Sequence, residues 1–225
     1  MSSETKSPNR RQRQAAETRR EILEVAQRLF LERGYAATSI RDIAAEADVA
    51  VQTIYSSIGS KAALGAALSD HLDESAGVGE VLGRIQQAGS AAEVIELAVG
   101  IPRAFAEGET GQTVRAVESA AAVEPEMAGV LAEGGRRHRE GAGRIVGLVD
   151  DRFGLRSGVS VDHATAVFAT MTSPGVWREL TEQHGWSFDE AHEWIAGRLI
   201  AELLEPGAAA KEPRGPASDG KGGKG

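Results

Sequence analysis

Residues that could hold a metal ion are scattered along this chain of 225 residues rather than grouped in a known signature. Asp189 and His192 lie one helical turn apart with Glu193 beside them, but they lack an obvious third ligand. The other histidines considered as ligands are His138, His163 and His184. We interpret these side chains as parts of solvated polar helix faces, and we expect no bound metal.

Signatures of catalysis are missing from the sequence too. The chain has no cysteine, which excludes thiol nucleophiles, cysteine zinc sites and disulfides. It also has no glycine-rich phosphate loop, no Gly-x-Ser-x-Gly elbow and no pair of carboxylates that can be placed together. Arg136, Arg137, His138 and Arg139 could neutralise an anionic ligand, although a charged helix surface is the commoner explanation. We expect that the protein is not an enzyme and uses no cofactor.

Polar residues between 52 and 61 have the chemistry of a nucleic-acid contact surface. Gln52 can form two hydrogen bonds with adenine, and Thr53 can offer its methyl group to thymine. Tyr55 can donate to a phosphate, or it can pack against a neighbouring helix. The N-termini of the helices that open at Ser39 and Lys61 each carry a partial positive charge from the helix dipole. The Lys61 side chain adds a full positive charge. These side chains predict contacts with double-stranded DNA.

Short helices must position these side chains. Ile22, Leu29 and Phe30 belong to an amphipathic stripe that predicts a helix over 16–33, ended by Gly34. Ser39 opens a second helix of about two turns, with Asp42 completing a capping box.

A turn follows at 47–49, where Asp48 tolerates a left-handed backbone. A further short helix begins at Val51, and Ser60 caps a longer one from Lys61 to about Glu74.

The spacing of helix, three-residue turn and helix at 39–56 is that of a helix-turn-helix. Apolar side chains would lock the two helices together: Ile40, Ile43, Ala44, Val49 and Ile54. The alternative is a structural corner in a helical bundle, without any contact to DNA.

Charge is divided unevenly along the chain, whose formal net charge is −8. Residues 1–61 hold ten Lys/Arg against eight Asp/Glu, whereas residues 62–225 hold fifteen against twenty-five. We expect residues 1–14 to form a basic, disordered arm. Its Arg10, Arg11 and Arg13 either insert into a DNA minor groove or stay solvated.

The rest of the chain predicts an all-α fold. No alternating strand pattern occurs, and Ala, Leu, Glu and Arg favour helix. The expected helices span about 80–88, 91–107, 111–123, 125–153, 162–171, 174–184 and 188–204. We expect a DNA-binding domain at 15–75, a second helical domain at 76–205 and a disordered tail at 206–225. The longest uncharged stretch, His163 to Trp177, is too short and polar to span a bilayer, so we expect a cytoplasmic protein without a membrane partner.

Several blocks of sequence resemble the DNA-binding domain of the TetR family of bacterial repressors. They run from Thr18 to Phe30, from Gly34 to Ala44, through Thr53-Ile54-Tyr55 and through Gly59-Ser60-Lys61. The sequence departs from the family at Asp48, where glycine is usual, and at Ala50, where Ser or Thr usually caps the helix. Ser57 and Ile58 replace a common His-Phe pair.

The resemblance implies a homodimer that binds a palindromic operator and is released by a small-molecule effector of unknown identity. It places Thr38, Tyr55 and Lys61 at positions that usually touch the DNA backbone. We expect the full set of DNA contacts to be Thr38, Ser39, Arg41, Val51, Gln52, Thr53, Tyr55 and Lys61. The run from Met171 to Trp177, followed by Gly185-Trp186-Ser187, resembles the dimerisation region of one subgroup. With the last helix it predicts an interface of Val176, Trp177, Leu180, Trp194, Ile195 and Leu199.

The second domain contains features that favour backbone rearrangement. Pro102 either separates two consecutive helices or kinks one that lines a cavity. A predicted helix contains Gly129, Gly134, Gly135, Gly141, Gly143 and Gly147, so it should be marginal, interrupted or closely packed. We expect an effector pocket bounded by the helices around 91–107, 111–123 and 125–147. The candidate effector contacts are Arg103, Phe105, Arg115, Glu118 and His138.

The sequence also allows two other functions. The chain could be a helical enzyme or lipid-binding protein with a vestigial DNA-binding domain. It could also be a constitutive regulator that responds to no effector.

Overall fold

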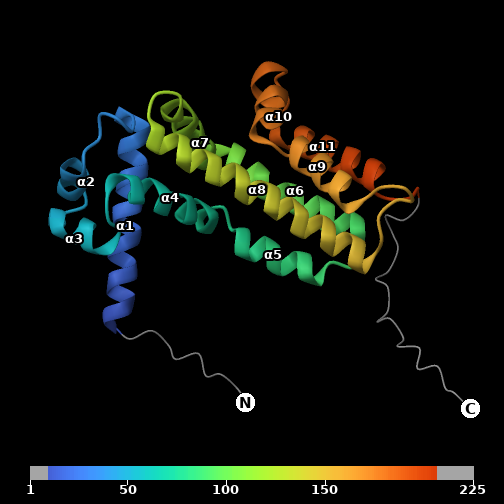
Figure 1. The fold of residues 1–225 in the computed structure, drawn as a ribbon, viewed down its shortest axis with the longest axis horizontal. Coiled ribbons are helices and arrows are strands. Elements are labelled where there is room, and N and C mark those ends of the chain that lie inside the picture. Colours follow the sequence, from blue (N-terminus) through green and yellow to red (C-terminus); the bar gives the residue numbers. More distant parts are fainter. Residues whose placement is uncertain (1–9, 207–225) are drawn as a thin grey trace, which may run out of the picture. The chain divides into compact units, whose positions relative to one another are not determined.

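A computed structural model describes residues 10–206 of the chain. Over these residues the structure contains helices and no strand, which confirms the all-α prediction. The helices are α1 (Arg10–Arg33), α2 (Ile40–Glu46), α3 (Val51–Ser57), α4 (Lys61–Ser75), α5 (Val78–Gln87), α6 (Ala91–Ala106), α7 (Gly108–Ala121), α8 (Pro125–Arg152), α9 (Val161–Met171), α10 (Pro174–Arg178), the π-helix η1 (Glu179–Gln183) and α11 (Phe188–Leu203) (Figure 1). Among the described residues, no helix has both the length and the apolar character that crossing a bilayer requires.

Two compact units make up the described chain. The first contains the residues up to Gly77 together with Phe105–Gly135, and the second contains Val78–Ala104 and the residues from Arg136 onward. The first unit therefore includes a segment that was predicted to belong to the second domain. The domain boundary at residue 75 stays a prediction.

The core of the first unit is built around the buried stripe of α1. Ile22, Ala26 and Leu29 are fully buried there, beside apolar residues of α2, α3 and α4. Met127, from the first turn of α8, belongs to the same core and is 2 % exposed. Gly65 of α4 makes room for it, because a Cβ at that position would lie 2.6 Å from the Met127 Cε atom.

The second unit packs α5, most of α6 and the larger part of α8 with the C-terminal helices. Its core includes Ile85, Val94, Val99, Val146, Phe168, Ile195, Leu199 and Leu203. The Arg152 guanidinium donates hydrogen bonds to the carbonyl oxygens of Ile85 and Ala88, at 3.3 and 2.6 Å. These bonds cap the C-terminal end of α5 and the residue that follows it, where carbonyl oxygens have no intrahelical partner.

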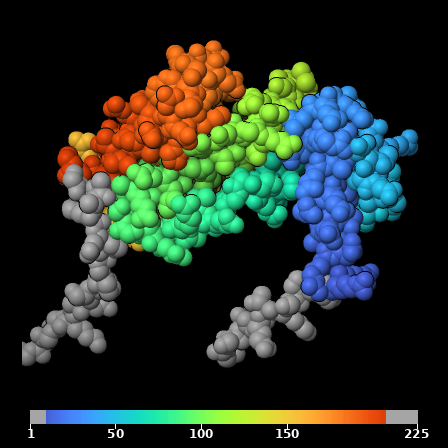
Figure 2. Space-filling view, turned by 180° about the vertical axis from the view of Figure 1, so that it is seen from behind, coloured from blue at the N-terminus to red at the C-terminus, as the bar shows by residue number. Residues whose placement is uncertain are grey.

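Several helix boundaries differ from the predicted ones. α1 begins at Arg10 rather than at residue 16, so the basic residues from Arg10 to Arg13 lie on a helix rather than in a disordered arm. The exposed N-terminal turns of α1 extend past the helices packed on it (Figure 2). The rest of the predicted arm, 1–9, and the part of the predicted tail from 207 to 225 lie outside the described residues.

The proline in α6 and the glycines in α8 do not interrupt these helices, although both residue types disfavour a helix interior. α6 runs through Pro102 as one helix, so the interpretation as two consecutive helices is wrong. α8 continues without a break over 28 residues, which contradicts an interrupted helix. A Cβ added at Gly129, Gly134 or Gly147 would have no atom within 4 Å, so close packing does not explain these glycines.

Candidate nucleic-acid interface

The helix-turn-helix is made by α2, a tight turn and α3. Ser39 accepts a hydrogen bond from the Asp42 backbone N–H, and Asp42 accepts one from the Ser39 backbone N–H, which confirms the predicted capping box. The backbone of Asp48 is left-handed, with φ at 51°, as predicted for the turn. Ala50 at the start of α3 makes no side-chain capping bond. The two helices are thus set at their angle by the turn and by their apolar contacts.

Burial of one face of the motif leaves the other face open. Ile43 and Ile54 are fully buried against α1, and Ile40 and Ala44 are nearly so. On the opposite side of α3, Gln52 is exposed, Tyr55 is 51 % exposed and Thr53 is half-buried. Tyr55 therefore does not pack into the core, and α3 presents polar side chains outward as a recognition helix does.

Arg19, for which the sequence predicts no role, joins the C-terminal end of α3 to α1. Arg19 donates a hydrogen bond through Nη1 to the Ser57 carbonyl oxygen at 2.8 Å. An arginine at a helix C-terminus satisfies free carbonyls and opposes the negative end of the helix dipole. Arg19 lies within the first block of the family resemblance, but neither its type nor its spacing indicated this partner.

Thr38 is a structural residue in this fold. Its side chain is 1 % exposed, and its hydroxyl donates to the carbonyl oxygens of Gly34 and Leu29, at 2.9 and 3.2 Å. A buried hydroxyl with two partners inside the protein has no proton left for a phosphate. The contact with DNA assigned to Thr38 stays a prediction.

Lys61 is also held by the protein itself. Its Nζ donates to the Tyr35 carbonyl oxygen at 2.6 Å and lies 4.1 Å from the centre of the Tyr35 ring. The ammonium group thus sits beside the loop between α1 and α2, near the start of the motif. These contacts hold the Lys61 ammonium group against Tyr35. The contact of Lys61 with DNA stays a prediction.

The remaining predicted contacts differ in exposure. Ser39 and Arg41 are exposed at the start of α2, whereas Val51 is half-buried and packs against the core of the first unit. Hydrogen bonds from the Ser39 side chain and backbone lower the pKa of Asp42 below its usual value. Asp42 thus carries its negative charge at neutral pH beside any phosphate that approaches Ser39.

The five candidate effector contacts are divided between the two units. Phe105 packs against the core of the first unit, which also contains Arg115 and Glu118. In the second unit, Arg103 forms a salt bridge with Asp189 at 2.7 Å, and the His138 Nε2 atom lies 2.9 Å from the Ala169 carbonyl oxygen. The effector site assigned to these residues stays a prediction.

The residues predicted for the dimer interface fall into two classes. Trp177, Ile195 and Leu199 are at most 1 % exposed, because they pack inside their own unit. Trp194 is 38 % exposed and forms an edge-to-face pair with Trp186, with ring centres 5.8 Å apart. Val176 and Leu180 are half-buried. An interface formed without rearrangement would use Trp194 and the exposed parts of Val176 and Leu180.

The model of the tetR family of bacterial regulatory proteins matches residues 22–68, which contain the helix-turn-helix. An HTH-type transcriptional repressor of Mycobacterium tuberculosis is 42% identical over 78 residues, and so is an HTH-type transcriptional regulator of Mycobacterium bovis. In both cases the match covers 35% of this chain and 38% of the relative. The chain thus spans well under half the length of these curated relatives.

Solved structures of regulators share the fold over most of the chain. One from Syntrophomonas wolfei has a TM-score of 0.68 and 19% identity, covering 83% of this chain and 94% of that one. A second, from Mesorhizobium loti, has a TM-score of 0.65 and 18% identity, covering 88% and 100%. Both are described as TetR-family transcriptional regulators. The helix-turn-helix of this chain thus matches the tetR family of bacterial regulatory proteins, and the chain shares its overall fold with these solved regulators.

Proposed function

We propose that this protein is a DNA-binding transcriptional repressor that acts as a homodimer on a palindromic operator and is released by a small-molecule effector. The observation that carries the proposal is the pair of exposed polar side chains, Gln52 and Tyr55, on a helix locked to α1 by Ile54. A recognition helix needs this combination, because base edges are read only by side chains whose positions are fixed.

The comparisons support a repressor more than an activator. The matched Mycobacterium tuberculosis protein is named a repressor, and the structural neighbour NalD is the secondary repressor of a multidrug efflux pump in Pseudomonas aeruginosa. Two other neighbours point to effectors of low molecular mass. A transcriptional regulator from Saccharomonospora viridis was crystallised with choline, and another neighbour is a gamma-butyrolactone receptor.

Selection of bound fragments from the organism's genomic DNA would test operator binding. We expect one enriched palindrome for the unaltered protein. Gln52→Ala should lose about 1–3 kcal/mol of discrimination at one base position in each half-site. Gln86→Ala, at an exposed glutamine of α5, is the matched control and should bind as the unaltered protein does. The absence of any enriched site would refute the proposal.

The homodimer follows from the size of the recognition element, since one short helix reads only a few base pairs and specificity needs two half-sites at fixed spacing. We expect Trp194→Asp to shift the protein from dimer to monomer in sedimentation velocity. Val123→Asp alters a valine of the first unit that is 77% exposed, and it should leave the dimer intact. An unchanged dimer for Trp194→Asp would place the interface elsewhere.

Release by an effector sets an energetic requirement. Conversion of a 99:1 population of DNA-competent dimer to 1:99 needs a preference of about 10⁴-fold, or about 5.5 kcal/mol, for the released state. We propose that α8 contributes to this change, because glycines in a helix interior make bending less costly. Replacement of both Gly141 and Gly143 by alanine should then blunt release and leave ligand-free DNA affinity intact. Normal induction of the double variant would exclude this role.

A further inference from the structure

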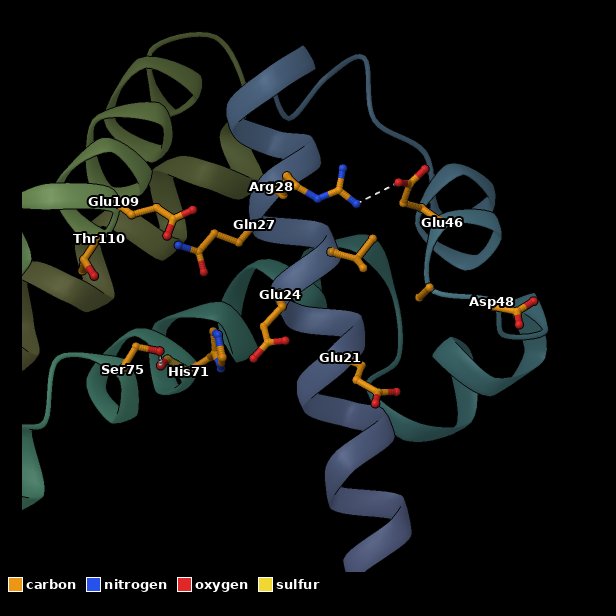
Figure 3. Close-up of a pocket in the computed structure, with 12 residues that line it drawn as sticks. Glu21, Glu24, Gln27, Arg28, Glu46, Asp48, His71, Ser75, Glu109 and Thr110 are labelled. Carbon is orange, nitrogen blue, oxygen red and sulfur yellow. Dashed lines mark hydrogen bonds and ion pairs between the residues drawn. The ribbon is translucent and has the colours of Figure 1, made fainter.

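An open groove of about 680 Å³ lies within the first unit, beside α1. One part of it is bounded by α1, α4 and α7, which contribute Glu24, Gln27, His71, Ser75, Glu109 and Thr110 (Figure 3). The groove continues around α1 toward the turn between α2 and α3, where Glu21, Glu46 and Asp48 add carboxylates. Its lining therefore carries far more negative than positive charge.

The one arginine in the lining is already neutralised. Arg28 pairs with Glu46 at 2.8 Å and with Glu32 at 3.5 Å. Glu24 pairs with Arg20 across one turn of α1, but both side chains are about half exposed, and such pairs exchange readily with solvent or with another cation. Glu109 has no ion-pair partner among the described residues, and neither has Glu21. The groove thus presents carboxylates that a cation could reach.

His71 adds to the groove a polar group that is independent of the carboxylates. It is 8 % exposed, and its ring stands up from α4 into the space beside Glu24 and Gln27 (Figure 3). The Ser75 hydroxyl bonds only the His71 backbone carbonyl, and the ring nitrogens have no hydrogen-bond partner among the described residues. The ring nitrogens are not among the fully buried atoms that lack a partner, so they open onto the groove, where a bound molecule can reach them.

The arrangement favours an organic cation over a metal ion. Among residues 10–206, no three His, Asp or Glu side chains come close enough to hold a metal. The carboxylates are instead spread along the groove, with Glu21 and Glu24 about 4.5 Å apart along the axis of α1. Gln27 and Thr110 add an amide oxygen and a hydroxyl oxygen to the lining. Ammonium groups linked by short methylene chains match acceptors that are spread along a groove in this way.

We propose that the part of the groove between α1, α4 and α7 binds an aliphatic diamine or polyamine. Glu24 and Glu109 receive its ammonium groups, and a ring nitrogen of His71 that carries no proton accepts a hydrogen bond. The site lies in the unit that contains the helix-turn-helix, and its existence does not depend on the DNA-binding function proposed above.

Calorimetric titration of the full-length protein with spermidine and with putrescine, at fixed ionic strength, would test the site. We expect saturable binding of one ligand per chain, weakened about tenfold or more by Glu24→Gln and by Glu109→Gln, since each removes a charge-assisted hydrogen bond. Glu17→Gln is the matched control, because Glu17 is an exposed carboxylate of α1 outside the groove. It should change the affinity less than about twofold.

His71→Leu tests the buried imidazole, and its thermal unfolding would be measured beside the titration because the residue is buried. A folded His71→Leu protein should bind spermidine more weakly than the unaltered chain. If Glu17→Gln weakened binding as much as the groove variants do, the amine would be attracted by net charge alone. If neither Glu24→Gln nor Glu109→Gln changed the affinity, the ligand would bind elsewhere. Either outcome, or a lack of saturable binding, would overturn the proposal. Titration with Mg²⁺ in place of the amine should give no saturable heat, and tight Mg²⁺ binding would also contradict it.

Discussion

Lys61 holds Tyr35 from two directions: its ammonium group donates to the Tyr35 carbonyl oxygen and lies over the Tyr35 ring. Tyr35 in turn donates from its hydroxyl to Glu126 Oε2 at 3.1 Å. The three residues join the start of α4, the loop before α2 and the first turn of α8. The residue expected to bind a phosphate is therefore also part of the fold of the first unit.

Replacement of Lys61 by methionine should lower the free energy of unfolding in the absence of DNA. The expected loss is about 1–2 kcal/mol, because one charge-assisted hydrogen bond and one cation–π contact disappear. Denaturant unfolding of the unliganded protein would measure it. An unchanged midpoint would mean that Lys61 makes no net contribution to the fold.

The same variant should weaken binding to operator and to unrelated DNA by similar factors. If Lys61 also neutralises a phosphate, the dependence of log K on log salt should become shallower by about one. Fluorescence anisotropy over a series of salt concentrations gives this slope. Loss of stability with an unchanged slope would make Lys61 a residue of the fold alone.

Tyr35 makes the stability of the first unit sensitive to alkaline pH. Burial, followed by the hydrogen bond to Glu126, raises the pKa of Tyr35 well above its ordinary value. Because the folded state keeps the proton more tightly than the unfolded chain, this contribution is complete below about pH 10 and is lost as the pH rises further. Tyr35→Phe should remove the part of the loss of stability at alkaline pH that comes from Tyr35. Parallel unfolding curves for both proteins between pH 8 and pH 11, about the titration range of tyrosine, would check it.

The sequence predicted the helix-turn-helix in detail because its signals are local. The capping box at Ser39 and Asp42, the turn at Asp48 and the cap at Ser60 each depend on residues within four positions of one another. The contacts of Thr38 and Arg19 depend instead on which carbonyl oxygens the fold brings near, at separations of up to 38 residues. A helical period indicates which face is buried, but it does not identify the partner of a polar side chain.

Long-range packing explains the other differences. Met127 was expected in a separate domain, yet it belongs to the core beneath the helix-turn-helix, where Gly65 leaves space for it. Ile195 and Leu199 form an apolar stripe that could equally have faced a partner subunit. A stripe buried inside the protomer and a stripe buried against a partner subunit have the same helical periodicity. Only the tertiary structure shows that Ile195 and Leu199 are buried within the protomer.

Asp48 is expected to reduce stability slightly relative to the glycine usual in the family. Its φ of 51° is tolerated by aspartate but strained for most side chains with a Cβ atom. We expect Asp48→Ala to destabilise the protein by about 1 kcal/mol, while Asp48→Gly leaves it unchanged or slightly more stable. Thermal unfolding of the three proteins would rank them. A more stable alanine variant would show that the turn relaxes to another conformation.

Two glycines in neighbouring helices should respond oppositely to the same substitution. At Gly129 of α8 an added Cβ would have no atom within 4 Å, so Gly129→Ala should stabilise the helix by up to about 1 kcal/mol. At Gly111 of α7 the Cβ would lie 2.1 Å from the Ala106 carbonyl oxygen, which belongs to the backbone and has little freedom to move. Gly111→Ala should therefore destabilise the protein by about 1–3 kcal/mol or more through overpacking.

Differential scanning calorimetry of both alanine variants would show whether these glycines serve different purposes. A rise in melting temperature for Gly129→Ala would mean that the protomer does not need a residue without a side chain at position 129 in order to fold. A fall would instead mean that something covers α8 at this position in solution, since the described residues leave the space open. For Gly111 the close approach of α6 and α7 is the reason for glycine, and a stable alanine variant would contradict that approach.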